Sequence, residues 1–194
     1  MTTPKILVFP GSNRAGSINA RLAGVITKEL ALQGAEVTRI SLLDYPLPMF
    51  DEDLESEKGI PDNVMKLARL FATHQGVVIV TPEYNSSLPP LLKNTLDWIS
   101  RVSKDGTKPL APYRGNHFAL AACSGGGLGG IRVLPHLRDI LVSIGGQVIT
   151  EQLALANAYS AYDDMENLKP GRSRELLGGM CASLIEKSKW MDRL

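Results

Sequence analysis

The segment Gly11-Ser12-Asn13-Arg14-Ala15-Gly16-Ser17-Ile18-Asn19 follows a short apolar run and precedes a stretch with helical apolar spacing. This order predicts a β-strand that turns through a polar loop directly into the start of an α-helix. Several backbone N–H groups and the positive end of the helix dipole converge at such a turn, where they can bind an anion. The sequence therefore predicts a phosphate site, with Ser12, Ser17 and Asn19 as neutral donors and Arg14 as the cation.

The spacing within this loop disfavours the two commonest nucleotide-binding loops. Gly11 and Gly16 have the separation found in a nucleoside triphosphate loop, but Ser17 stands where that loop requires lysine. The loop also lacks the dinucleotide-binding motif, because Asn13 and Arg14 stand at positions where that motif brings the backbone close to a pyrophosphate. A terminal phosphate remains as the candidate ligand. It carries a charge of about −1.5 to −2, which Arg14 and the helix dipole would largely balance. In the alternative interpretation, Ser17 only caps the helix and Gly11 only forms a turn.

Apolar runs bounded by turn residues alternate with segments of helical spacing along the chain. The expected strands are Ile6–Phe9, Val37–Leu42, Val77–Val80, Phe118–Cys123 and Val148–Ile149. The expected helices are Ile18–Leu32, Val64–Phe71, Leu91–Val102, Ile131–Ile144 and Arg174–Trp190. The near-continuous apolar strands indicate burial on both faces, and hence an α/β three-layer sandwich around a five-stranded parallel sheet. The proline-rich and acidic segment Asp44–Pro61 is expected to be a surface loop.

The order of the strands predicts where a ligand binds. Five parallel strands in the flavodoxin-like order 2-1-3-4-5 reverse direction between the first and the third strand. Ligands bind outside the carboxyl ends of the strands at that reversal. We therefore expect the loop after Phe9 and the loop after Val80 to share one cleft.

Composition limits the possible partners and compartment. The 194 residues are 44% hydrophobic and 21% charged, which fits a single globular domain over residues 1–194. The net charge of +1, without a basic run interleaved with aromatic residues, argues against nucleic acid and anionic membrane as partners. No signal segment precedes Ile6 and no apolar stretch has the length of a membrane span, so we expect a cytoplasmic protein.

Cysteine and histidine usage predicts that no metal is bound. Cys123 and Cys181 lie far apart and neither belongs to a Cys-x-x-Cys pair, which suits a reducing compartment. His74, His117 and His136 are isolated in the sequence and lack metal-ligand spacing. Isolated histidines are more often surface or core residues than ligands.

The loop after Val80 is rich in hydrogen-bonding groups and reads Thr81-Pro82-Glu83-Tyr84-Asn85-Ser86-Ser87-Leu88-Pro89-Pro90. Glu83, Asn85 and the backbone near Tyr84 can line the polar edge of a flat heterocycle, and the Pro82 and Tyr84 side chains offer apolar surface. Alternatively, Asn85 or Ser87 only caps the next helix, and Glu83 is a solvated loop charge.

The loop after Cys123, Ser124-Gly125-Gly126-Gly127-Leu128-Gly129-Gly130, has three interpretations. Three of its glycines match the dinucleotide fingerprint, with Glu151 near the position of the ribose-binding acid. The same glycines let backbone approach a planar ring and bond its carbonyl oxygens. A serine nucleophile at Ser124 with His136 as base is disfavoured, because Ala122 replaces the first glycine of that motif and His136 falls within the following helix.

Three pieces of sequence together resemble one family. They are Gly11-Ser12-x-Arg14-x-x-Ser17-x-Asn19, then Pro82-Glu83-Tyr84-Asn85-x-Ser87-x-Pro89-x-x-Leu92-Lys93-Asn94-x-Leu96-Asp97-Trp98, then Ser124-Gly125-Gly126 with Gly129-Gly130-x-Arg132. From Lys5 to about Gly146 the chain resembles the NADPH-dependent FMN reductase family, flavodoxin-like flavoproteins that include quinone, chromate and azo-dye reductases. The Pro-Glu-Tyr-Asn block and the helix after it are the most specific part of this resemblance.

The resemblance implies a cofactor site, position by position. The residues implied to hold the phosphate of a non-covalently bound FMN are Ser12, Arg14, Ser17, Ile18 and Asn19. Those implied to border the isoalloxazine ring are Pro82, Glu83, Tyr84 and Asn85, with Ser124, Gly125, Gly126 and Gly127 on its pyrimidine side. The cofactor would perform the electron chemistry, so no catalytic side chain is expected, although Tyr84 is a candidate proton donor.

The resemblance also implies a reaction and an assembly. NADPH or NADH would pass hydride to flavin N5, and a quinone, flavin, chromate or azo compound would then take its place, which gives ping-pong kinetics. A homodimer or homotetramer is expected, with the Leu91–Val102 helix as a candidate contact through Trp98 and Arg101, unless Trp98 belongs to the core. Two alternatives stay open: an FMN-binding sensor without turnover, and an NAD-type dehydrogenase that uses the Gly125–Gly130 loop.

Overall fold

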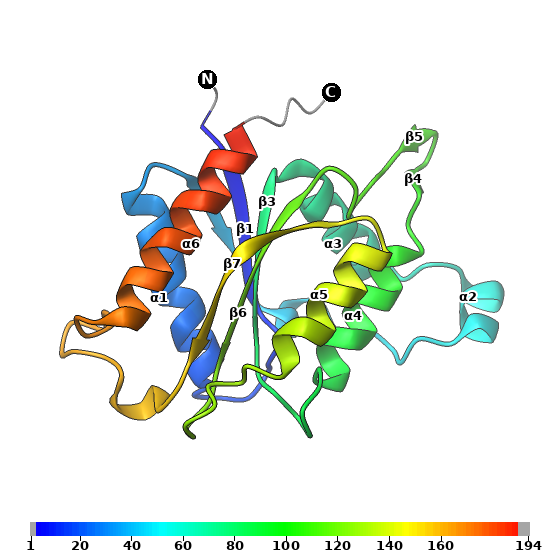
Figure 1. The fold of residues 1–194 in the computed structure, drawn as a ribbon. Helices are drawn as coiled ribbons and strands as arrows, with labels where there is room; N and C mark the ends of the chain where they lie inside the picture. Colours follow the sequence, from blue (N-terminus) through cyan, green and yellow to red (C-terminus); the bar gives the residue numbers. More distant parts are fainter. Residues whose placement is uncertain (1–2, 190–194) are drawn as a thin grey trace.

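The computed structural model describes residues 3–189, and they form an α/β fold around one parallel sheet (Figure 1). The sheet has the order β2-β1-β3-β6-β7, which confirms the predicted order. All four pairings between neighbouring strands are parallel. The strands are β1 (Lys5–Pro10), β2 (Glu36–Arg39), β3 (Gly76–Thr81), β6 (His117–Cys123) and β7 (Gln147–Leu155).

Helices cover both faces of the sheet, as the apolar strands predicted. One face carries α1 (Ile18–Leu32) and α6 (Arg172–Lys189), and the other carries α3 (Asp62–Thr73), α4 (Pro90–Ser100) and α5 (Val133–Ser143) (Figure 1). Successive side chains of a strand point to opposite faces. In β1, Ile6 and Val8 therefore pack on the α1–α6 side, whereas Leu7 and Phe9 pack on the other side. Burial on both sides explains why the strand is apolar at every position from Ile6 onwards.

Two predictions about the segment after β2 were wrong. The predicted strand Val37–Leu42 ends early, at Arg39, because Ser41 Oγ accepts a hydrogen bond from Leu43 N and starts a short 3-10 helix, η1 (Leu42–Asp44). The expected surface loop contains a helix, α2 (Glu52–Lys58). Asp51 caps this helix, since its carboxylate accepts hydrogen bonds from Asp53 N and Leu54 N.

The end of the chain also differs from the prediction. The edge strand β7 continues well past the predicted Val148–Ile149. The prediction was too short because the residues around Glu151 are polar and exposed, which breaks the apolar pattern. A short hairpin of β4 (Lys104–Asp105) and β5 (Lys108–Pro109) was not predicted. The last helix begins at Arg172, and its predicted end at Trp190 lies outside the described residues.

The carboxyl ends of the strands meet at one edge of the sheet. Pro10 pairs with Val80, Thr81 with Ala122, and Cys123 with Leu155, so β1, β3, β6 and β7 end side by side. The loops that follow them are therefore neighbours in space, although they are far apart in the sequence. This register confirms that the loops after β1 and β3 share one region.

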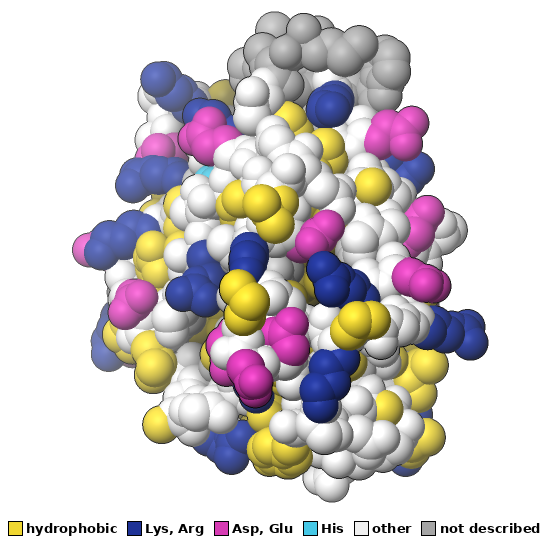
Figure 2. Space-filling model, turned by 90° about the vertical axis from the view of Figure 1, so that its left-hand side faces the viewer, with side chains coloured by type: hydrophobic (Ala, Val, Ile, Leu, Met, Phe, Trp, Pro, Cys, Tyr) yellow, Lys and Arg dark blue, Asp and Glu magenta, His cyan; other side chains and the backbone are white. Residues whose placement is uncertain are grey.

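The surface over α1 and α6 is mixed in charge. Lys and Arg side chains alternate with Asp and Glu on this face, and hydrophobic side chains lie scattered among them (Figure 2). Within residues 3–189, no helix combines the length and the apolar character that crossing a bilayer requires.

Candidate functional site

The loop after β1 presents free hydrogen-bond donors at the start of α1. Gly11 N donates to Val80 O over 2.8 Å, which fixes the loop against β3. Ser17 is the N-cap of α1, and its Oγ accepts a hydrogen bond from Ala20 N. The backbone N–H groups of Ile18 and Asn19 have no acceptor among residues 3–189. These donors, at the positive end of a helix, are available to an anion.

Arg14 adds a cation to this loop. Its side chain is exposed and forms no ion pair with any residue between 3 and 189. Its backbone N lies 3.4 Å from Ser12 Oγ, and its carbonyl accepts a hydrogen bond from Ser17 N, so the loop curls around the helix start. The arrangement places one positive side chain beside the free N–H groups.

Asn19 joins the loop after β1 to the end of β6. Its side chain is only 3% exposed, and Nδ2 donates to Cys123 O over 3.4 Å. Cys123 N in turn donates to Asn19 Oδ1 over 3.2 Å. The side-chain amide of Asn19 therefore forms the same pair of hydrogen bonds with Cys123 that the backbone of a neighbouring strand would form. This pair fixes the start of α1 relative to the loop after β6.

The loop after β3 contains a tight hairpin turn. Tyr84 and Ser87 exchange two backbone hydrogen bonds of 3.0 Å, and the two residues between them, Asn85 and Ser86, have φ values of 49° and 68°. Positive φ at both central residues is typical of a type I′ turn, which asparagine tolerates well. The turn leaves the Tyr84 side chain half exposed at the rim of the site.

Glu83 binds the start of α5 instead of facing solvent. Its side chain is 8% exposed and forms an ion pair with Arg132. Its carboxylate accepts hydrogen bonds from Arg132 N at 2.9 Å, Arg132 Nε at 2.7 Å and Val133 N at 3.2 Å. Burial opposes ionisation of Glu83, but the hydrogen bonds from Arg132 outweigh it and lower the pKa. The carboxylate is thus ionised and already engaged at the start of α5.

The glycine loop after β6 is held to the segment after β7. Ser124 N donates to Leu155 O over 3.2 Å, and Asn157 N donates to Gly126 O over 3.1 Å. Gly125 lies against the ring of Tyr159, since a Cβ at this position would be 2.6 Å from Tyr159 Cε2. The missing Cβ at Gly125 therefore lets the Tyr159 ring approach the backbone of this loop.

The three loops line one cavity of about 200 Å³. Its lining residues are Ser12, Arg14, Ser17, Ile18, Asn19, Pro82, Glu83, Tyr84, Cys123, Ser124 and Gly125. Three of the predicted site residues, Asn85, Gly126 and Gly127, lie outside this lining. Cys123 belongs to it and was not predicted, because its apolar flank suggested packing alone.

Cys123 is a neutral side chain in this cavity. Burial raises the pKa of its thiol to about 12, so the reactive thiolate is absent at neutral pH. Tyr159, from the 3-10 helix η2 (Ala158–Ser160), is a second residue that the sequence did not reveal. Its exposed ring lies beside Gly125, and no pattern in the sequence brings the segment after β7 to this loop.

Comparison with known proteins identifies the family. The model of the NADPH-dependent FMN reductase family matches residues 4–160. The chain belongs to this family. The quinone reductase of Escherichia coli strain K12 is 38% identical over 148 residues, which cover 76% of this chain and 74% of that protein. The NAD(P)H-dependent FMN reductase of Pseudomonas aeruginosa is 28% identical over 195 residues, covering 98% and 96%.

A solved structure shares the fold. FerB, a flavoenzyme NAD(P)H:(acceptor) oxidoreductase from Paracoccus denitrificans, matches with a TM-score of 0.80 and 23% identity, over 97% of this chain and 99% of that one. The predicted family is thus confirmed, and with it an oxidoreductase that uses FMN and a reduced nicotinamide. The match extends past the Gly146 limit of the sequence resemblance.

The geometry also explains why the NAD-type alternative fails. A dinucleotide fold needs free N–H groups at the helix that follows the glycines, but Arg132 N and Val133 N at the start of α5 already donate to the carboxylate of Glu83. Glu151, the supposed ribose-binding acid, lies in the middle of β7 and accepts a hydrogen bond from Ser183 Oγ on α6. The glycine loop therefore lacks both parts of a dinucleotide site.

The serine hydrolase alternative fails because Ser124 and His136 have other hydrogen-bond partners. His136 Nδ1 lies 3.1 Å from Ser87 Oγ, a hydroxyl of the loop after β3. Ser124 Oγ instead donates to Gly126 O over 3.2 Å. Nucleophilic activation requires the base to contact the nucleophile, and the structure pairs this histidine with a different serine. Within residues 3–189, no three His, Cys, Asp or Glu side chains gather as a metal site requires.

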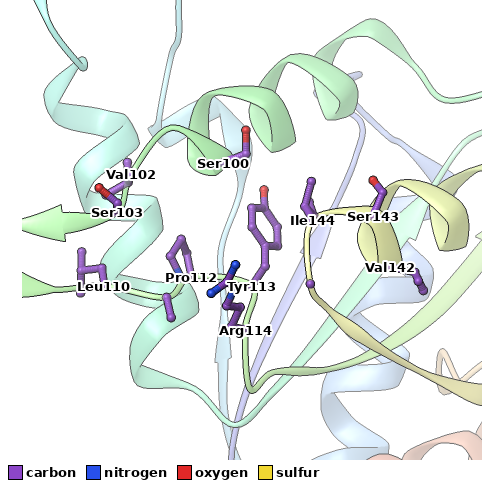
Figure 3. Close-up of a pocket in the computed structure, with 12 residues that line it drawn as sticks. Ser100, Val102, Ser103, Leu110, Pro112, Tyr113, Arg114, Val142, Ser143 and Ile144 are labelled. Carbon is purple, nitrogen blue, oxygen red and sulfur yellow. The ribbon is translucent and has the colours of Figure 1, made fainter.

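A larger cavity, of about 720 Å³, lies at the opposite edge of the sheet (Figure 3). It is bounded by the ends of α4 and α5, near Ser100 and Ser143, and by Tyr113 and Arg114 just before β6. Open α/β sheets bind ligands at the carboxyl ends of their strands, whereas β6 begins at this edge. The smaller cavity is therefore the candidate functional site.

Proposed function

We propose that this chain is an NAD(P)H:quinone oxidoreductase that holds FMN in the cavity at the carboxyl edge of the sheet. The observation that carries the proposal is the meeting of three loops, far apart in the sequence, around one cavity. One of them offers free donors and a cation, and the other two offer backbone and aromatic surface. FMN has the matching parts, a charged phosphate and a flat ring.

The start of α1 suits the FMN phosphate. The free N–H groups of Ile18 and Asn19, the hydroxyls of Ser12 and Ser17, and the Arg14 guanidinium all line the cavity. Hydrogen bonds to an ionised phosphate are shorter and stronger than neutral ones. Asn19 contributes through its backbone and through the fixed position of α1, since its amide already binds β6.

The other two loops suit the isoalloxazine ring. Pro82 and Tyr84 present apolar surface, and the backbone of Glu83 and of Ser124-Gly125 can bond the polar edge of the ring. Asn85, Gly126 and Gly127 are exposed and closely follow lining residues in the sequence, and we propose that they contact the ring from outside this lining. The absence of a Cβ at Gly125 lets the Tyr159 ring pack directly against the backbone there.

The protein's own groups bind and orient rather than react. When bound, FMN supplies the chemistry, since its N5 accepts hydride from a nicotinamide and releases electrons to an acceptor. Backbone N–H groups near Gly125 and Gly126 can stabilise negative charge that develops on the pyrimidine side. Tyr84 is the candidate proton donor, because its side chain is half exposed at the rim of the cavity. The Cys123 thiol stays protonated at neutral pH, because burial raises its pKa to about 12.

Steady-state kinetics test the proposed reaction. Because donor and acceptor use the same open face of the ring in turn, NAD(P)H and a benzoquinone are expected to give parallel double-reciprocal lines. Intersecting lines would contradict a shared face. NADPH is also expected to bleach the flavin absorbance under anaerobic conditions, and protein that stays yellow would instead be a flavin-binding sensor without turnover.

We propose that the protein is at least a homodimer whose contact surrounds the cavity. Four large hydrophobic side chains near it are exposed, namely Tyr84, Leu128, Ile131 and Tyr159. Trp98 is not part of this surface: it is fully buried and its Nε1 donates to Pro48 O, so it belongs to the core.

Light scattering is expected to show a dimer or tetramer, and the double substitution Leu128→Glu with Ile131→Glu should shift the oligomeric state towards monomer. A wild-type monomer at micromolar concentration would refute this assembly.

We also infer a reducing, cytoplasmic environment for the protein. Cys123 and Cys181 are both buried and unpaired, and they lie in different parts of the core on the α1–α6 side. Free buried thiols are typical of proteins kept in a reducing compartment. A reduced nicotinamide is also the donor that such a compartment supplies.

A further inference from the structure

A third cavity, of about 490 Å³, adjoins the proposed FMN cavity on the side of β2. One wall is the loop after β1, from Ser12 to Ala15, and the other is the segment after β2, from Arg39 to Asp44. Ser12 and Arg14 line both cavities. We refer to this cavity as the β2 cavity. A ligand in the β2 cavity would lie directly beside the loop after β1.

Arg39, the last residue of β2, is the second cation of this region. It is exposed and forms no ion pair with any part of the chain that the structure describes. Its guanidinium lies against α1, since a Cβ at Gly24 would be only 2.9 Å from Arg39 Nη1. Because Gly24 has no Cβ, α1 leaves room for this charged group beside the cavity.

Besides the two arginines, the β2 cavity offers serine hydroxyls, hydrogen-bond acceptors and apolar surface. Asn13 Oδ1 is buried and accepts no hydrogen bond from any residue in 3–189. The Asp44 carboxylate is exposed at the wall, where it can accept from hydroxyl groups. Ile40 and Leu43 supply apolar surface. A fitting ligand would carry an anionic group, hydroxyl donors and a flat apolar part.

We infer that the β2 cavity binds the adenosine half of NADPH and that Arg39 recognises its 2′-phosphate. This inference rests on the proposed function, because it takes FMN to occupy the neighbouring cavity and Arg14 to be engaged with the FMN phosphate. A ribose and its 2′-phosphate supply the hydroxyl donor and the dianion, and adenine supplies the flat part. Arginine binds phosphate through two parallel hydrogen bonds, which makes Arg39 the residue that distinguishes NADPH from NADH.

The first test compares the two nicotinamides. In Arg39→Ala, the ratio of kcat/KM for NADPH to kcat/KM for NADH is expected to fall about tenfold or more, because a charge-assisted contact that only NADPH makes is lost. Arg69→Ala is the matched control: it also removes one exposed arginine, whose guanidinium binds Asp105 on the surface, and it should leave the ratio as it is. An equal fall for both nicotinamides, or no fall, would overturn the inference.

The second test needs no turnover. Calorimetric titration of the FMN-loaded protein should show adenosine 2′,5′-bisphosphate binding at least about tenfold more tightly than adenosine 5′-monophosphate, and Arg39→Ala should abolish the difference. Equal binding of the two nucleotides to the wild-type protein would refute the inference. If no quinone is reduced with either nicotinamide, the proposed function fails, and this titration still decides whether the β2 cavity recognises the phosphate.

Discussion

Replacing Arg14 and Ser17 together with alanine is expected to release FMN and leave the protein colourless after gel filtration. The change removes the only charged side chain of the proposed phosphate site and one hydroxyl donor. A hydrogen bond to a charged group contributes about 1.5–3 kcal/mol, so the affinity for FMN should fall by roughly a hundredfold or more. Fluorescence titration of the apoprotein with FMN measures the loss directly.

The fold itself should survive this double change. Losing the N-cap at Ser17 costs about 1 kcal/mol, a small part of the stability of a domain. Arg69→Ala, a remote surface arginine, should keep its FMN and serves as the matched control. If the double variant stays yellow through gel filtration, the phosphate does not bind at the start of α1.

Among glycine-to-alanine substitutions in the glycine loop, Gly129→Ala is expected to lower the stability of the protein the most. Gly129 has a φ of +62°, and a Cβ there would lie 2.8 Å from Ala156 N and from the carbonyl carbon of Leu155. These atoms are backbone at the end of β7, so they cannot move aside cheaply. Backbone strain and overpacking each cost about 1–3 kcal/mol, and urea unfolding of the apoprotein should show a loss of about 3 kcal/mol or more.

The same loop offers a control for this prediction. Gly127 has no positive φ and no atom within 4 Å of the position that a Cβ would take. Gly127→Ala should therefore leave the urea midpoint of the apoprotein nearly unchanged. Equal destabilisation by the two substitutions would mean that the loop is sensitive to any side chain and that the close approach to β7 is not the cause.

The sequence predicts the sheet well because its core strands are covered on both faces. Short, continuous and β-branched apolar runs such as Val77–Val80 are typical of buried strands, and the strand order then places two of the loops at one edge. The loop after β1 was predictable as a strand-to-helix turn, since a strand, a polar turn and a helix follow each other within one short segment. These features depend on local sequence, which a single chain reveals.

What escaped prediction depends on contacts between distant segments. Nothing in the local sequence shows that Glu83 caps α5 or that the Asn19 amide bonds Cys123, because each partner is many positions away. Tyr159 reaches Gly125 only through the fold of the chain after β7. The edge strand β7 was predicted too short, since one exposed side allows polar residues that break the apolar pattern. The helix α2 was missed because proline and acidic residues around it resemble a loop.

The carboxylate of Glu83 also makes the two helix starts at this edge unequal. Helices α1 and α5 both begin at the carboxyl edge, and each would present about half a positive charge there. Glu83 occupies the first N–H groups of α5 and its own charge is balanced by Arg132, whereas the N–H groups of Ile18 and Asn19 at α1 have no acceptor among residues 3–189. We therefore expect a mononucleotide to bind with its charged tail towards α1 and its neutral ring towards α5, so that one of two opposite orientations is favoured.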